Sequence, residues 1–164
     1  MLGGDIQVES KEKEGSKFFF QIPFIKAEHE LNRKNDTNII MDRDLSKYTI
    51  LIVDEEDSNY QLTKRVLSPS KVATAWAKNG KFAVEMVTTN KYDLILMDIK
   101  MPEMDGIEAT RLIKQHNVKI PIIVQTAYAM KEVRDEALQA GCDDFIVKPI
   151  ELDNFLELVN KHIN

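Results

Sequence analysis

Acidic, hydroxyl and ammonium side chains each follow an apolar run in this sequence, and together they could handle a phosphoryl group. They are Asp54 and Glu55, Asp98, Thr126 and Lys148. Clustered carboxylates repel one another, and a hard divalent cation relieves that repulsion. Oxygen ligands without histidine or thiolate favour Mg²⁺. A carboxylate beside such an ion could attack phosphorus and form an acyl phosphate. Thr126 could then donate a hydrogen bond to a phosphoryl oxygen, and Lys148 could neutralise its charge.

Five strands, predicted by five apolar runs, have to bring these side chains together. The runs lie at residues 50–53, 72–77, 94–97, 120–124 and 145–147, and helical patterns lie between them. Unbroken apolar runs of this length are typical of parallel strands buried on both faces. Strands that alternate with helices indicate an α/β fold, here a doubly wound five-stranded parallel sheet with helices on both faces. The carboxyl ends of such strands meet at one edge, where open α/β sheets bind ligands.

Each of these polar residues also has a structural explanation when it is taken alone. Acids after strands often cap helices, threonine ends many strands, and a Lys-Pro pair is common in turns. Polar residues of complementary chemistry at four strand ends are harder to explain in this way. We therefore interpret them as one site.

Residues 48–164 resemble the receiver domain of two-component response regulators. The motifs that carry the resemblance are ILIVDE at residues 50–55, DLILMDIKMPEMDG at 93–106, IIVQTA at 122–127 and FIVKP at 145–149. The resemblance implies a flavodoxin-like sheet with strand order 2-1-3-4-5 and a cis peptide bond between Lys148 and Pro149. It also implies roles for individual residues: Asp98 as phosphoacceptor; Asp54, Glu55, Asp98 and the backbone carbonyl of Lys100 as Mg²⁺ ligands; Thr126 and Lys148 as phosphoryl contacts; and Thr126 and Phe145 as switch residues.

Three positions modify these expectations. Glu55 stands where the family usually has aspartate, so we expect looser or water-bridged Mg²⁺ coordination. Phe145 lacks the hydroxyl of the tyrosine found in many members, and its switch is expected to work by packing alone. Tyr128 is expected to shield the acyl phosphate from water and slow its hydrolysis.

Residues 1–25 form a separate segment in which polar and apolar residues alternate on either side of a Gly-bearing polar turn. This pattern predicts a β-hairpin. The segment resembles the closing strands of histidine-kinase ATP-binding domains, but the rest of the ATP site is missing, so we expect no ATP binding. Residues 26–47 are charged and Asn-rich and predict a linker. This order resembles that of a hybrid sensor histidine kinase, with the receiver at its end.

Composition excludes several other classes of protein. The formal net charge of −5 disfavours nucleic acid or an anionic membrane as partner, and no apolar run approaches the roughly 20 residues of a membrane span. The single Cys142 rules out an internal disulfide and suits a reducing compartment. We therefore expect a cytoplasmic fragment whose parent protein could be anchored in a membrane.

The expected function is to take a phosphoryl group from a phosphohistidine onto Asp98, with Mg²⁺, and to switch conformation. The expected partner is a histidine-kinase phosphohistidine domain or a histidine phosphotransfer protein; homodimerisation and enzyme status stay open. The alternative, left open by Glu55, is a receiver-fold interaction module that is not phosphorylated. An aspartyl-phosphate hydrolase would need an acid at position 100, which is Lys100, and the acidic segment at 54–57 would repel a flavin phosphate.

Overall fold

The computed structural model describes most of the chain in two units. The described residues are 5–11, 13, 15–21, 43–116, 119–127 and 131–163. Backbone contacts divide the chain into the units Met1–Asn32, which contains a hairpin, and Arg33–Asn164, which contains a five-stranded sheet. No helix among the described residues is long and apolar enough to cross a membrane. The predicted boundaries at 25/26 and 47/48 stay predictions, and the first of them falls among residues 22–42, which lie outside the described ranges.

The second unit is built on a parallel sheet whose strand order is β4-β3-β5-β6-β7. Its strands are β3 (Thr49–Val53), β4 (Ala73–Ala77), β5 (Leu94–Asp98), β6 (Ile122–Thr126) and β7 (Asp144–Val147). Numbered from the first strand of this unit, the order is 2-1-3-4-5, which confirms the predicted fold. The central strands are buried on both faces, as their unbroken apolar sequences require.

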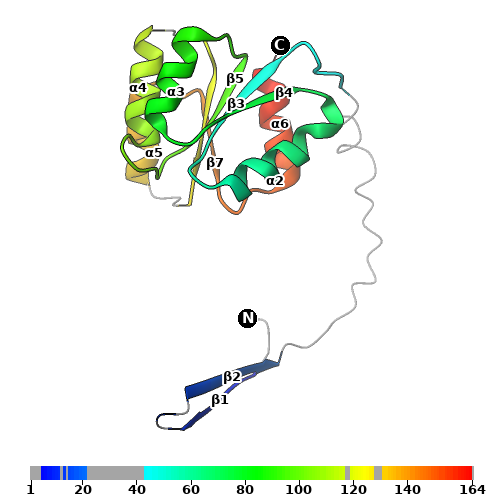
Figure 1. The fold of residues 1–164 in the computed structure, drawn as a ribbon, viewed down its shortest axis with the longest axis vertical. Helices are drawn as coiled ribbons and strands as arrows, with labels where there is room; N and C mark the ends of the chain where they lie inside the picture. Colours follow the sequence, from blue (N-terminus) through cyan, green and yellow to red (C-terminus); the bar gives the residue numbers. More distant parts are fainter. Residues whose placement is uncertain are drawn as a thin grey trace. The chain divides into compact units, whose positions relative to one another are not determined.

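Helices cover both faces of the sheet (Figure 1). Helices α2 (Asp57–Leu67) and α6 (Leu152–His162) lie on one face, and α3 (Gly80–Thr89), α4 (Gly106–His116) and α5 (Lys131–Ala140) lie on the other. Successive strand residues feed two separate cores. Ile50 and Ile52 pack with the α2 and α6 residues, whereas Leu51 and Val53 pack with α3 and α4. This alternation is the period of two expected of a strand covered on both sides.

The same alternation decides which polar side chains share a face where the strands end. Asp98 is in register with Gln125 of the neighbouring strand, so both side chains belong to the α2/α6 face. Backbone hydrogen bonds carry the pairing to the last residues: Asp54 N donates to the Ala77 carbonyl (3.1 Å), and Lys148 N donates to the Thr126 carbonyl (2.7 Å). The positions of the strand-end residues are therefore fixed by the sheet itself.

The first unit confirms the predicted hairpin. Strands β1 (Asp5–Lys11) and β2 (Gly15–Gln21) pair antiparallel, with Val8 opposite Phe18. Within this unit Ile6, Val8 and Phe18 are each more than half exposed. Two strands alone are marginally stable in water, and clustered exposed apolar side chains are typical of surfaces that interact with another element.

Candidate functional site

Three strand ends bring two carboxylates and an ammonium group into contact. Lys148 follows β7, and its Nζ donates to Asp98 Oδ1 at 2.7 Å and to Asp54 Oδ2 at 3.2 Å. Asp98 ends β5, and Asp54 follows β3. Residues separated by as many as 94 positions in the chain thus meet at the carboxyl edge of the sheet.

The three charged groups of this cluster are largely shielded from water. The side chains of Asp54, Asp98 and Lys148 are 4%, 14% and 25% exposed. Burial raises the pKa of Asp98 and outweighs the opposing hydrogen bond and charge of Lys148, while the charge of Asp54 adds to the increase. Burial lowers the pKa of Lys148, but contacts with both carboxylates more than reverse this, so its net pKa is raised. Lys148 therefore stays charged at neutral pH.

Asp54 is fixed in place by neighbours on both sides. Its Oδ1 accepts a hydrogen bond from Glu56 N (2.9 Å), and Asn59 Nδ2 lies 3.0 Å from Oδ1 and 3.1 Å from Oδ2. Trp76 Nε1 donates to the backbone carbonyl of Asp54 (2.9 Å). Sequence analysis did not single out Asn59 or the Trp76 contact. The only signal in the sequence is an amide residue in the first turn of a helix that follows a strand-end acid.

Thr126 and Gln125 lie at the end of β6, beside the strand that carries Asp98. Both are buried, and Thr126 is in register with Val147 of β7. Gln125 was not predicted to belong to the site. Its Nε2 has no hydrogen-bond partner among the described residues, although it is enclosed on the same sheet face as Asp98. A buried amide without a partner is unusual and costs stability.

Glu55 and Lys100 are placed differently from the paired carboxylates. Both are exposed, and both line a surface pocket of about 520 Å³ beside the β5–α4 loop. Within the described ranges, no three acidic, histidine or cysteine side chains are grouped as metal ligands. The structure thus brings together Asp54 and Asp98 but does not add Glu55 to them. The donors still suit Mg²⁺ in kind, because two hard carboxylates already converge on one positive charge.

The loop after Asp98 is held tightly against its strand. Gly106 N donates to the Ile99 carbonyl (2.8 Å), and a Cβ atom at position 106 would overlap the backbone carbonyl of Asp98. The close approach explains why glycine opens α4. The Lys148–Pro149 peptide bond on the other side of the site is cis, as the family resemblance implied.

Phe145, the expected switch residue, lies in β7 and is partly buried. The guanidinium carbon of Arg134, on α5, lies 4.3 Å from the centre of its ring, which is cation–π distance. Tyr128, expected to shield an acyl phosphate, lies outside the described residues.

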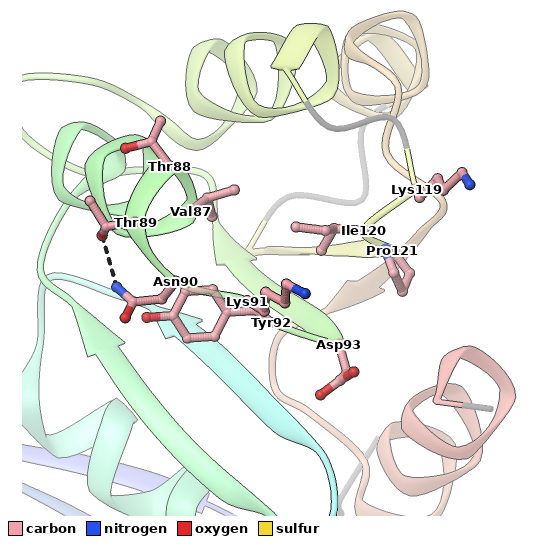
Figure 2. A pocket seen from close by; sticks show the side chains of 10 residues that line it. All are labelled: Val87, Thr88, Thr89, Asn90, Lys91, Tyr92, Asp93, Lys119, Ile120 and Pro121. Carbon is pink, nitrogen blue, oxygen red and sulfur yellow. Dashed lines mark hydrogen bonds between the residues drawn. The ribbon is translucent and has the colours of Figure 1, made fainter.

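A second pocket, of about 580 Å³, lies at the opposite edge of the sheet. Figure 2 shows Asp93 and Pro121 among its lining side chains, and these residues directly precede β5 and β6. Because Asp98 is at the other end of β5, this pocket is separate from the charged cluster.

Comparison with known proteins identifies the family to which this fold belongs. The protein-family model described as the response regulator receiver domain matches residues 50–160 of this chain. The chain belongs to the response regulator receiver domain family. The chemotaxis protein CheY of Bacillus subtilis is 42% identical to this receiver over 118 residues, which make up 71% of this chain and 98% of CheY. The autoinducer 2 sensor kinase/phosphatase LuxQ of Vibrio vulnificus is 35% identical over 153 residues, or 92% of this chain and 18% of LuxQ.

Solved receiver domains have the same architecture. The receiver domain of sensor histidine kinase PA1611 from Pseudomonas aeruginosa superposes with a TM-score of 0.66 at 30% identity, covering 71% of this chain and 97% of that one. That structure is described with magnesium coordinated in its active-site cleft. The chain spans less than a quarter of the length of AtoC from Escherichia coli and less than a fifth of LuxQ, so it corresponds to one part of each relative. This chain is a receiver of two-component signalling with a second, smaller unit before it.

Proposed function

We propose that Asp98 is the phosphoacceptor of this receiver and that it takes its phosphoryl group from a phosphohistidine. The observation that carries this proposal is the placement of Lys148 Nζ 2.7 Å from Asp98 Oδ1, with Asp54 on the same ammonium. A carboxylate at a strand end, next to a fixed cation, is placed to accept a dianionic group.

In the reaction, an oxygen of ionised Asp98 attacks phosphorus. The new O–P bond replaces the P–N bond of the phosphohistidine, and the imidazole keeps the electron pair of the broken bond. The Lys148 ammonium group, which contacts Asp98, lies next to the negative charge that the phosphoryl group brings to this residue. Thr126, at the end of the neighbouring strand, supplies a hydroxyl to a phosphoryl oxygen.

Mg²⁺ would be held by Asp54, Asp98 and the backbone carbonyl of Lys100, with Glu55 reaching it directly or through water. When bound, the ion supplies the positive charge that neutralises phosphoryl oxygens during transfer. The hard oxygen donors and the two carboxylates that converge on one cation support this assignment. Thr126 and Phe145 would report the phosphorylated state through a change in packing.

We further propose that the chain is the receiver end of a hybrid sensor histidine kinase. Residues 1–25 would be the last strands of its ATP-binding domain, 26–47 a linker and 48–164 the receiver. The match to LuxQ supports this because it extends over 153 residues, well beyond the 50–160 segment of the receiver itself. The exposed apolar side chains of the hairpin would pack against the earlier part of that domain. The partner would be a phosphohistidine domain or phosphotransfer protein in the cytoplasm.

Transfer from a radiolabelled phosphohistidine protein tests the proposal. Label should move to the wild-type chain when Mg²⁺ is present and should stay on the donor when the acceptor is Asp98→Asn. The interaction-module alternative predicts no transfer to either chain. Equal labelling of wild type and Asp98→Asn would show that another residue is the acceptor.

A further inference from the structure

The Asp54 carboxylate is saturated with hydrogen bonds in this structure. Oδ1 accepts from Glu56 N and Asn59 Nδ2, and Oδ2 accepts from Asn59 Nδ2 and Lys148 Nζ. A carboxylate offers about four lone-pair positions, so these contacts account for all of them. A metal ion that binds Asp54 therefore has to displace one of the donors.

The distances indicate which donor yields. Lys148 Nζ is closer to Asp98 (2.7 Å) than to Asp54 (3.2 Å), and it would be repelled by an incoming cation. It can release Asp54 and keep its shorter bond to Asp98. Asn59 is uncharged, so the cation would not repel it as it repels the Lys148 ammonium group. It would remain as the only side chain among these donors that contacts both oxygens of Asp54.

The backbone of α2 holds Asn59 in position to do this. Asn59 N donates to the Glu56 carbonyl (3.1 Å) in the first turn of the helix. The next residue, Tyr60, stacks on Trp76 with ring centres 5.0 Å apart, and Trp76 donates to the backbone carbonyl of Asp54. The start of α2 and the end of β3 are thereby tied together.

We propose that Asn59 is a positioning residue for Mg²⁺: its amide fixes the plane of the Asp54 carboxylate so that one oxygen faces the ion when Lys148 withdraws. This inference rests on the proposed function, since it concerns the ion that Asp54 and Asp98 would hold. Without Asn59, the carboxylate can rotate toward Lys148, which then competes more strongly with the ion. Removal of a hydrogen-bond partner of a metal ligand typically weakens metal binding by about 10- to 100-fold.

The test compares Asn59→Ala with Gln61→Ala. Gln61 is on the same helix, and its amide also contacts an acid, Asp57 at 3.2 Å, but not Asp54. The thermal unfolding midpoint of each full chain is measured over a series of Mg²⁺ concentrations, with KCl at matched ionic strength as the blank. Because a ligand that binds only the folded state raises this midpoint according to its Kd, the series yields the Mg²⁺ affinity without any assay of phosphorylation.

We expect Gln61→Ala to bind Mg²⁺ like wild type and Asn59→Ala to bind it about 10- to 100-fold more weakly. A merely structural role for Asn59 would lower the midpoint without Mg²⁺ and leave the affinity unchanged, which would overturn the inference alone. If wild type itself shows no Mg²⁺-dependent rise, both the inference and the metal assignment of the proposed function fail. Phosphotransfer to Asp98 is scored separately, in the labelling experiment.

Discussion

Removal of the Lys148 ammonium should destabilise the receiver, because two shielded carboxylates would lose their shared cation. In Lys148→Ala, Asp54 and Asp98 stay at the edge of the sheet with side chains that are only 4% and 14% exposed. Breaking a buried ion pair by removing one partner costs about 3–5 kcal/mol. Lys148 is itself 25% exposed, so we expect about 3 kcal/mol, at the lower end of that range.

Thermal unfolding in the presence of a metal chelator measures this cost. For a domain of this size about 3 kcal/mol corresponds to a drop of roughly 12 °C in Tm. Lys161→Ala is the matched control: Lys161 contacts Asp144 at 2.8 Å but is 62% exposed, and such surface pairs contribute below about 1 kcal/mol. Adding Asp98→Asn to Lys148→Ala should recover part of the loss, because one of the two repelling charges is gone. A Lys148→Ala chain as stable as the control would refute this account of the cluster.

Three further changes test other parts of the structure. Gly106→Ala should lower stability by about 1–3 kcal/mol or more in denaturant unfolding, because the new methyl group meets the backbone carbonyl of Asp98. An unchanged unfolding midpoint would contradict that contact. Gln125→Met should raise stability by roughly 1 kcal/mol, since it removes an enclosed amide donor that has no partner among the described residues at nearly the same volume; a loss of stability would show that the amide is satisfied. Burial raises the pKa of Asp144, but hydrogen bonds from α6 outweigh this and hold its pKa below the usual value. Its stabilising effect should therefore be present above pH 3.8 and lost as pH falls through the lowered pKa, and Asp144→Asn should flatten the acid limb of a stability–pH curve.

The sheet could be predicted because the apolar sequence of each strand already indicates that the strand is buried. Apolar runs such as residues 94–97 are covered on both faces in the structure, and the polar residue after each run marks the edge where the strands end. That Asp54, Asp98 and Lys148 lie at one edge follows from parallel topology, since the carboxyl ends of parallel strands share that edge.

Contacts between side chains of different elements could not be predicted in the same way. Asn59 lies in a polar segment with Ser58 and Gln61, and only the geometry of α2 shows that the Asn59 side chain is the one that reaches Asp54. The position of Glu55 likewise depends on a side-chain direction that sequence does not specify. In the sequence, Gln125 is simply one polar residue in a predicted strand. Only the structure, with helices packed on both faces of the sheet, shows that its amide is enclosed.

The most direct test of the central claim is the mass of the chain after treatment with acetyl phosphate and Mg²⁺. Reduction with borohydride converts an acyl phosphate into a stable alcohol, so that peptide mapping can locate the modified residue. The account predicts a gain of one phosphoryl group, located at Asp98, and none in Asp98→Asn or when Mg²⁺ is chelated. No gain in the wild-type chain, or a gain that persists in Asp98→Asn, would contradict it.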